Sequence, residues 1–282
     1  LVMDITVFFA VIFAAFLHAV WNAMVKNEEN KFFALSAIVF GHVPASVVLI
    51  FAVPYPSIES IPYILLSALL HILYQWFLLS AYRVGDYTVV YPIARGTGPI
   101  LATFFSLIFL GTILSNFELL GIFIISLGIL ILSFQRTESF RNRSAVIYAL
   151  ITGFFIMTYS ITDGLGARIS SSVMSYYGWV CILNALMFPV LLKIMKKSQP
   201  ISKFLLEGKK LFFIGGTISY FVYLIVLWGF TQAPIAMVAA LRETSIIIAL
   251  LIGTLFLKER FTALKAVSIL VIFVGVILLK FF

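Results

Sequence analysis

Ten long apolar runs, separated by short polar connections, constrain this chain more than any other feature of its sequence. They cover roughly residues 4–26, 32–53, 60–84, 87–111, 116–134, 144–164, 171–195, 209–232, 234–257 and 262–282. Each approaches or exceeds the length of about 20 residues that an α-helix needs to cross a bilayer. None alternates with the period of two that is typical of barrel strands. The sequence therefore predicts an all-α membrane protein with ten transmembrane helices.

The composition supports this class and excludes others. Hydrophobic residues make up 63% of the 282 residues, charged residues make up 11%, and the mean hydropathy is +1.15. A soluble domain of this length does not bury so much apolar surface with so few charges. The net charge of +8 indicates no nucleic-acid partner, because the basic residues lie between the apolar runs. Cys181 is the single cysteine, and without a ligand cluster we expect no metal and no cofactor.

The distribution of Lys and Arg predicts the orientation in the membrane. Fifteen of the 19 basic residues lie in or beside the connections that follow runs one, three, five, seven and nine. Only Arg168 and Lys280 lie on the other side, while Arg95 and Arg242 lie inside runs. Cytoplasmic connections are enriched in Lys and Arg. We therefore expect a multi-pass protein of the bacterial inner (plasma) membrane with both termini outside.

The two halves of the chain repeat one another. The shift that places Arg95 on Arg242 also places Thr97 on Thr244, and it places Gly128 on Gly275. Because each half holds an odd number of runs, the second half is expected to be inverted relative to the first. The sequence thus predicts a single transmembrane domain, 1–282, built from a first five-helix repeat, 1–134, and an inverted repeat, 144–282. Proteins with inverted repeats bind their solute near the bilayer midplane, between the repeats.

Small residues predict where two of the helices pack closely. Gly121 and Gly128 lie seven residues apart in run five, and Ser268 and Gly275 have the same spacing in run ten. Residues at this spacing share one helix face, and small side chains there let two helix backbones approach. We expect these faces of runs five and ten to serve close helix packing.

Arg95 and Arg242 are the main candidates for binding a ligand. A guanidinium group in a bilayer costs at least about 2.5–3.5 kcal/mol, so each must face protein, water or a ligand rather than lipid. Each lies about eight residues into its run, roughly 12 Å deep from opposite faces of a core of about 30 Å. Glu243 can pair with Arg242 or reach Arg95 across the interface. Two guanidinium groups against one carboxylate leave a positive charge that an anionic group can neutralise.

The residues around Arg95 predict an irregular helix. Pro92, Gly96, Gly98 and Pro99 flank the arginine, and they can loosen the helix and free backbone polar groups. Such irregularity is tolerated at membrane depth only where it is buried or lines a cavity. We expect a half-helix here that bends as one face of the protein opens and the other closes.

Further polar and aromatic side chains complete the predicted site. His18 and Asn22 share a helix face, as do Tyr159 and Asp163. Asp163 has two interpretations: it lines the cavity and receives an amine or a proton, or it lies in a solvated turn at the helix end. For His18 the alternative is an interhelical hydrogen bond, and for the aromatic residues it is the membrane interface. The expected binding residues are Arg95, Arg242, Glu243, His18, Trp21, Asn22, Tyr74, Tyr91, Tyr159, Asp163 and Tyr220.

Several segments resemble a known family. Ten spans in two inverted repeats, with Leu17-His18-Ala19-Val20-Trp21-Asn22-Ala23, Asp86 to Gly96 and Phe256-Leu257-Lys258-Glu259, are similar to the EamA family of the drug/metabolite transporter superfamily. The resemblance implies a secondary transporter of small metabolites with a cavity formed by spans 1, 3, 4, 6, 8 and 9. The chain departs from the family at Leu110-Gly111-Thr112, where the family often has an acidic residue. The family also usually has cytoplasmic termini, whereas the count of basic residues places them outside.

These observations favour a transporter that is not an enzyme. We expect it to move amino-acid-like or other carboxylate-bearing solutes, zwitterionic or anionic, by alternating access, with a proton as a further partner. The alternative is a lipid flippase or a lipid-phosphate-processing enzyme in which the two arginines hold a lipid phosphate. The protein is expected to act as a monomer or a homodimer. The substrate, the direction of transport and the coupling ion do not follow from the sequence.

Overall fold

The computed structural model describes residues 3–135, 142–256, 258 and 260–281, and every regular element among them is helical. Ten helical segments are long and apolar enough to cross a membrane, which confirms the predicted class. They are Ile5–Lys26, Lys31–Ala52, Ile58–Val84, Tyr87–Phe109, Asn116–Phe134, Arg143–Ile169, Val173–Ile194, Lys210–Gln232, Ile235–Leu255 and Ala263–Phe281. The predicted ends agree within a few residues, except that the sixth span continues to Ile169 instead of ending near residue 164.

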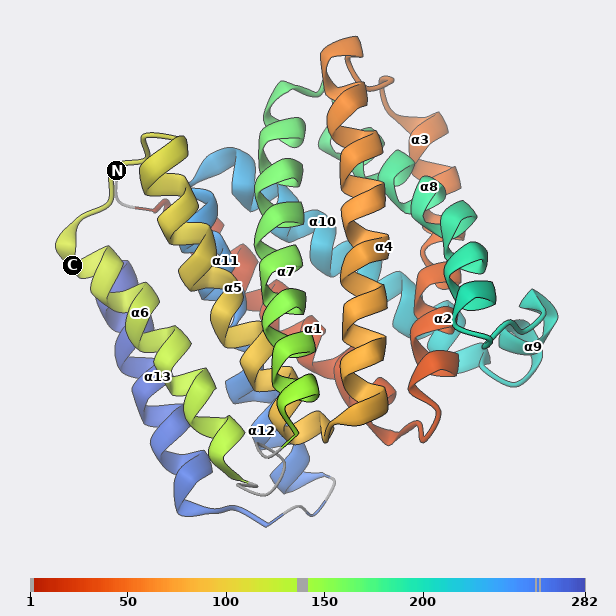
Figure 1. The fold of residues 1–282 in the computed structure, drawn as a ribbon. Helices are drawn as coiled ribbons and strands as arrows, with labels where there is room; N and C mark the ends of the chain where they lie inside the picture. The colour runs from red at the N-terminus through yellow and green to blue at the C-terminus, as the bar shows by residue number, and fades with distance from the viewer. Residues whose placement is uncertain (1–2, 136–141, 257, 259, 282) are drawn as a thin grey trace.

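Several spans consist of more than one regular element (Figure 1). The α-helices are α1 (Ile5–Asn27), α2 (Lys31–Gly41), α3 (Val43–Ala52), α4 (Ile61–Val84), α5 (Tyr87–Phe109), α6 (Asn116–Ile131), α7 (Arg143–Ile169), α8 (Val173–Ile194), α9 (Ile201–Leu206), α10 (Gly216–Gln232), α11 (Ile235–Arg242), α12 (Ser245–Leu255) and α13 (Ala263–Phe281). Short helical turns at Ile58–Ser60, Leu132–Gln135 and Lys210–Gly215 extend α4, α6 and α10.

Local chemistry sets the ends of the helices nearest the centre. The carboxylate of Asp86 accepts a hydrogen bond from the backbone N–H of Thr88 at 3.0 Å, which satisfies one of the free N–H groups at the start of α5. His42 joins α2 to α3, and Pro44 occupies the first turn of α3, where its missing N–H costs no hydrogen bond. The second span therefore bends at His42 rather than running straight.

The helix packing is reciprocal between the two halves. α1 packs against α10 as α7 packs against α4, and α1 packs against α12 as α7 packs against α5. The fifth span also packs against the tenth, α6 with α13, and the second against the seventh, α3 with α8. Exchanging the two halves leaves these pairings unchanged, whereas the close contact of α5 with α6 has no counterpart of similar extent between α12 and α13. Such packing is what two related five-helix units produce, and it brings α1, α4, α5, α7, α10 and α11 to the centre.

α6 and α13 pack against each other through their small residues; the sequence predicted close packing at these residues but did not name the partner helix. These helices lie side by side at one edge of the bundle (Figure 1). A Cβ atom on Gly121 would lie 2.8 Å from the carbonyl oxygen of Gly275, and one on Gly275 would lie 2.8 Å from that of Gly121. Ser268 is fully buried. The two backbones therefore approach more closely than any larger side chain allows.

The expectation of a broken helix at Arg95 is wrong. α5 is continuous through Pro92 and Pro99, whereas the ninth span is interrupted after Arg242. The glycines of α5 serve close packing instead: a Cβ atom on Gly96 would lie 2.8 Å from Leu130 Cγ.

The interruption of the ninth span lies at Glu243 and Thr244. The backbone N–H of Glu243 donates to Ala240 at 3.0 Å, and that of Thr244 donates to Leu241 at 3.1 Å, both three residues back. This is the tighter 3₁₀ pattern, which inside a helix often marks a hinge. The discontinuity thus belongs to the second repeat, one residue after the arginine that matches Arg95.

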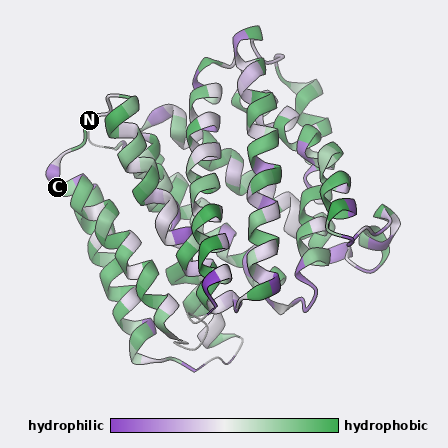
Figure 2. Ribbon diagram, in the orientation of Figure 1, coloured by the Kyte–Doolittle hydropathy of each residue, from purple (hydrophilic) through white to green (hydrophobic). Residues whose placement is uncertain are grey.

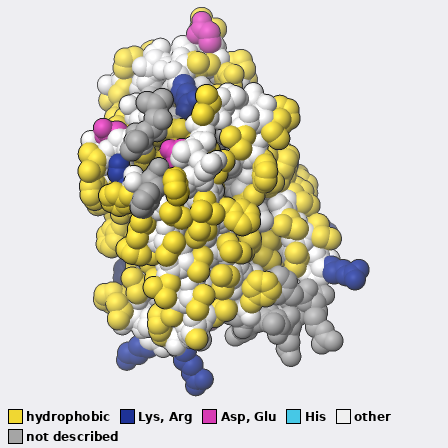
Figure 3. All heavy atoms as spheres, turned by 90° about the vertical axis from the view of Figure 1, so that its left-hand side faces the viewer, with side chains coloured by type: hydrophobic (Ala, Val, Ile, Leu, Met, Phe, Trp, Pro, Cys, Tyr) yellow, Lys and Arg dark blue, Asp and Glu magenta, His cyan; other side chains and the backbone are white. Residues whose placement is uncertain are grey.

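The exterior is apolar between two more polar ends. Hydrophobic residues dominate the outward surfaces of the helices (Figure 2), and a broad hydrophobic surface covers the middle of the face in Figure 3. The first turn of α1 and the last turn of α13 lie at one end of the bundle, opposite the connections that follow α1 and α4 (Figure 1). The surface fits a multi-pass membrane protein. Two of the basic residues counted for orientation, Arg136 and Arg141, and the acidic residue of the family segment, Glu259, lie outside the described residues.

Candidate functional site

A cavity of about 150 Å³ lies between the two five-helix units. It extends from the ends of α1 and α4, where Lys31, Tyr82 and Tyr87 lie, to the middle of the bundle. Its walls come from α1, α2, α4, α5, α7, α8, α10 and α11. Spans two and seven therefore contribute as well as the six spans that the family resemblance implied. The lining residues used below are His18, Trp21, Asn22, Lys31, His42, His71, Tyr74, Gln75, Tyr82, Tyr87, Tyr91, Arg95, Tyr159, Tyr177, Tyr223 and Arg242.

Two guanidinium groups and one carboxylate meet at the inner end of this cavity. Arg95 Nε lies 2.8 Å from Glu243 Oε2, and Arg242 Nη2 lies 3.4 Å from Glu243 Oε1. All three side chains are at least 90% buried. Glu243, at the interruption of the ninth span, therefore contacts both arginines, so both of the pairings that the sequence left open are present. The cluster retains one uncompensated positive charge.

The guanidinium groups also retain unused hydrogen-bond donors. Among the described residues, Arg95 Nη2 and Arg242 Nε are buried and have no hydrogen-bond partner. The Arg95 guanidinium carbon lies 5.8 Å from the ring centre of Tyr91, whose hydroxyl accepts a hydrogen bond from Asn22 at 3.4 Å. A buried donor without an acceptor costs roughly 1–3 kcal/mol, and more when it is charged. An anionic group in the cavity would satisfy both the charge and the donors.

Aromatic rings form much of the remaining wall. The rings of His18 and Trp21 lie 5.0 Å apart at a steep angle on α1. Tyr74 of α4 lies 5.3 Å from Tyr159 of α7, whose ring stacks on His71 at 4.3 Å. Such surfaces accept flat, partly apolar groups through edge and face contacts. The cavity therefore combines one cationic end with aromatic sides.

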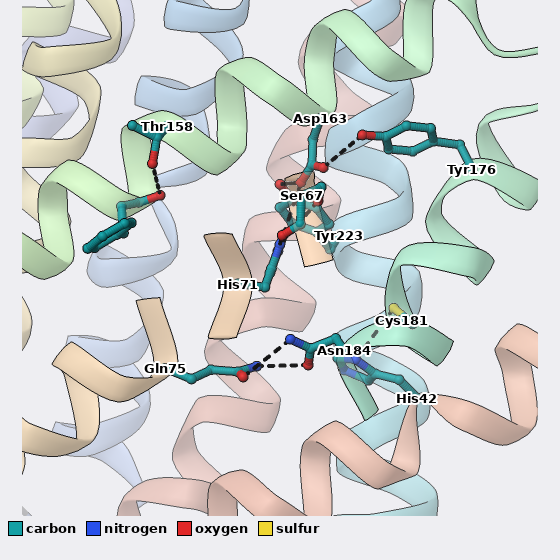
Figure 4. Close-up of polar contacts among 11 residues, drawn as sticks. His42, Ser67, His71, Gln75, Thr158, Asp163, Tyr176, Cys181, Asn184 and Tyr223 are labelled. Atoms are coloured by element: carbon teal, nitrogen blue, oxygen red, sulfur yellow. Dashed lines mark hydrogen bonds and ion pairs between the residues drawn. The ribbon is translucent and has the colours of Figure 1, made fainter. Parts of the chain in front are cut away.

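A second polar cluster lies beside the cavity, around Asp163 (Figure 4). This carboxylate accepts hydrogen bonds from Tyr223 at 2.6 Å and from Tyr176 at 3.2 Å. His71 Nε2 lies 3.9 Å from its Oδ2 atom. Asp163 is fully buried within α7, which continues for six residues beyond it. The interpretation of Asp163 as part of a solvated helix end is therefore wrong.

The structure brings most of the predicted binding residues together. His18, Trp21, Asn22, Tyr74, Tyr91, Arg95, Tyr159 and Arg242 line the cavity. Glu243 and Asp163 do not line it themselves, but each contacts a residue that does. Tyr220 is wrong as a cavity residue, because its fully buried ring stacks on Tyr177 at 4.9 Å, outside the lining. Positions 220 and 223 are three residues apart, so their side chains leave the helix in directions that differ by about 60°, and Tyr223 lines the cavity instead.

The sequence interpretation missed His42, His71, Gln75 and Tyr177 as lining residues. All three histidines of the chain, His18, His42 and His71, contribute to the cavity wall. An imidazole inside an apolar span is costly, so its presence alone was a usable signal. Gln75 exchanges amide hydrogen bonds with Asn184 at 3.0 and 3.3 Å, which ties α4 to α8 beside the cavity.

The fold and the cavity together define a class, a polytopic α-helical membrane protein with a polar chamber between two packed halves. The model of the EamA-like transporter family matches residues 143–281, in agreement with the resemblance seen in the sequence. A solved structure described only as "Crystal structure of protein" has a TM-score of 0.75 and 14% identity, covering 98% of this chain and 97% of that one. At this identity the likeness shows the fold alone. A comparison with curated proteins gives no match.

Proposed function

We propose that this protein is a secondary transporter of small carboxylate-bearing metabolites, including amino-acid-like solutes. The observation that carries the proposal is the buried cluster of Arg95, Arg242 and Glu243, which has one positive charge in excess and faces a cavity. A guanidinium group presents paired donors that match a carboxylate. Uncompensated buried charge is costly, and a carboxylate ligand removes that cost when it binds.

The position of the cluster suits transport by alternating access. Arg95 comes from the first repeat, and Arg242 and Glu243 come from the second, so the solute would contact both moving halves. The hinge at Glu243 and Thr244 is next to the charged groups. We propose that movement of α11 relative to α12 carries Arg242 and Glu243 past Arg95 and changes the side from which the cavity is reached. In this proposal the cavity opens to the cytoplasm, the termini lie outside, and the protein sits in the bacterial inner membrane.

Uptake into proteoliposomes tests the proposal. The purified protein is reconstituted and loaded with a panel of unlabelled amino acids and organic acids, and exchange of radiolabelled members is measured. We expect exchange of at least one carboxylate-bearing solute and none of solutes that lack an anionic group. Arg95→Gln and Arg242→Gln should each reduce this exchange by at least tenfold. Arg83→Gln is the matched control, since Arg83 lies exposed at the end of α4.

Retained exchange in both arginine variants would overturn the cationic site. Because loss of a buried arginine can also disturb folding, thermal unfolding of each variant is measured in the same preparation. Arg95→Lys provides a further comparison, since it keeps the charge but loses the planar pair of donors. A solute recognised through a bidentate contact should bind this variant more weakly than the wild type, even when the variant is folded.

A lipid carrier is the second candidate, and one specific observation favours it. A smaller pocket of about 110 Å³ with mainly apolar walls adjoins the main cavity and shares Asn22, Tyr87 and Tyr91 with it. It lies among α1, α5, α12 and α13. A lipid phosphate on the two arginines would place its chains toward this pocket. Translocation of a fluorescent phospholipid by the reconstituted protein, without exchange of water-soluble solutes, would support this candidate.

A further inference from the structure

Asp163 is a buried carboxylate that the proposed solute site does not use. It is fully buried, and its two oxygens accept hydrogen bonds from Tyr223 and Tyr176. Tyr223 and His71 line the cavity and contact Asp163, which lies outside the lining itself (Figure 4 shows these side chains together). Of the two ligands that the sequence suggested for this residue, an amine and a proton, the geometry favours the proton.

His71 connects Asp163 to the cavity. Its Nδ1 atom lies 3.0 Å from the backbone oxygen of Ser67 and 3.3 Å from the Ser67 hydroxyl. A carbonyl oxygen only accepts hydrogen bonds and a hydroxyl can accept them, so the shorter contact favours the tautomer with the hydrogen on Nδ1. The other ring nitrogen, Nε2, therefore holds the exchangeable site, and it faces Asp163 Oδ2 at 3.9 Å. The ring itself lines the cavity and is partly exposed there. Nε2 can thus receive a proton from cavity water while its product, an imidazolium, faces a carboxylate.

Groups from several helices surround this pair. The titratable side chains that face it are Tyr74 from α4, Tyr159 from α7, Tyr176, Tyr177 and Cys181 from α8, Tyr223 from α10, and His42 at the junction of α2 and α3. Tyr159 stacks on His71 and lies within electrostatic range of Arg95, Arg242, Glu243 and Asp163. The proton site and the proposed solute site are therefore electrostatically linked through one ring.

A charge count links the two sites further. An anionic group of the solute neutralises the excess positive charge of the cluster of Arg95, Arg242 and Glu243. A proton on His71 forms an imidazolium that faces the Asp163 carboxylate. Binding of the anion and the proton together adds no net charge to a region of low dielectric constant, where an added charge is costly. On release, loss of the anion favours loss of the proton for the same reason.

We propose that His71 and Asp163 form a proton-binding site that couples the movement of one proton to that of one anionic solute in the same direction. This inference rests on the proposed function. In the loading step, a proton from water adds to the lone pair of His71 Nε2, and the imidazolium pairs with the Asp163 carboxylate while Nδ1–H remains bonded to Ser67. The loaded carrier then holds the solute and the proton with no net charge, and releasing both returns the pair to its first state.

The transport test uses phenylpyruvate, a strongly acidic aromatic carboxylate that suits the aromatic walls and is almost wholly ionised near neutral pH, so that little of it crosses lipid unaided. Proteoliposomes one pH unit more alkaline inside than outside should accumulate it up to about tenfold, because the proton gradient supplies a tenfold ratio. Protein-free liposomes set the background. Asp163→Asn should retain exchange of internal for external phenylpyruvate but lose accumulation, and His71→Gln should also lose accumulation. Glu207→Gln removes an exposed carboxylate and should accumulate like the wild type.

Accumulation by Asp163→Asn equal to that of the wild type would overturn the proton site. If the wild type exchanges no phenylpyruvate, this arm counts against the solute class in the proposed function, and the second arm decides the proton site. That arm follows the ¹⁵N signals of the three histidines in lipid nanodiscs without solute. The signals of His71 are identified as those that disappear in His71→Gln. We expect Nε2 of His71 to take up a proton as the pH falls while Nδ1 stays protonated. The midpoint of this titration should move to lower pH in Asp163→Asn. An Nε2 signal that does not titrate, or a midpoint unchanged in Asp163→Asn, overturns the proposal.

Discussion

Arg95 of α5 and Glu243 of the hinge between α11 and α12 form an ion pair of 2.8 Å that joins the two repeats in the middle of the bundle. The same carboxylate also contacts Arg242 at 3.4 Å. One acidic group thus holds two basic groups from different halves of the chain. In the proposed mechanism the two halves separate at this pair, so the pair links stability to the proposed function.

Replacement of Glu243 tests this link. Glu243→Met leaves two buried guanidinium groups without a carboxylate, and removing one partner of a buried pair typically costs about 3–5 kcal/mol. We expect a marked fall in Tm. The double variant Arg95→Met/Glu243→Met removes the pair together and should unfold at a higher temperature than Glu243→Met alone. The measurement is thermal unfolding in one detergent. Additive effects of the two substitutions would show that the ion pair contributes nothing.

The sequence predicted the architecture and the charged centre because both follow from large free-energy costs that a single residue or one short segment imposes. An apolar run of about 20 residues has few alternatives to a membrane span. An arginine inside such a run must be compensated, so Arg95, Arg242 and the neighbouring Glu243 could be grouped before their distances were known. The small residues at Gly121 and Gly275 were informative for the same reason, since close backbone contact excludes larger side chains.

The rest depended on packing that the sequence does not reveal. Pro92 and Gly96 suggested a bend in α5, yet Gly96 accommodates Leu130 and the helix continues. The hinge forms instead at Glu243, where no proline or glycine marks it. Helix phase decided that Tyr223, and not Tyr220, reaches the cavity. The length of α7 decided that Asp163 is buried, although the Gly164-Leu165-Gly166 segment resembles a helix end.

Cysteine labelling tests the predicted orientation. Ser198→Cys lies in the exposed connection after α8, and Glu59→Cys lies exposed at the opposite end of the bundle. Because basic residues concentrate on the side of Ser198, a membrane-impermeant thiol reagent should label Glu59→Cys in intact cells and Ser198→Cys only after the cells are opened. The buried native Cys181 should give little background. The opposite labelling pattern would invert the orientation and the side to which the cavity opens.

Hydrogen exchange tests the hinge. Around Glu243 and Thr244 the backbone bonds reach three residues back rather than four, which gives poorer hydrogen-bond geometry. In lipid nanodiscs, the amides of residues 243–247 should exchange faster than those of residues 93–98 at the matching depth of α5. Mass spectrometry of overlapping peptides separates the two segments. Equal protection would indicate that the interruption is rigid and that the movement between repeats occurs elsewhere.

The contact between Gly121 of α6 and Gly275 of α13 predicts a sharp dependence of stability on a single methyl group. In Gly121→Ala the new Cβ atom would lie 2.8 Å from a backbone oxygen, which cannot rotate away as a side chain can. Separating the helices should cost about 1–3 kcal/mol, the usual range for overpacking, and should lower the Tm. Leu127→Phe adds more volume on an exposed face of the same helix and should leave the Tm nearly unchanged. Because α6 and α13 contribute no side chain to the main cavity, solute exchange by folded Gly121→Ala should persist, and its loss would show that this pair moves during transport.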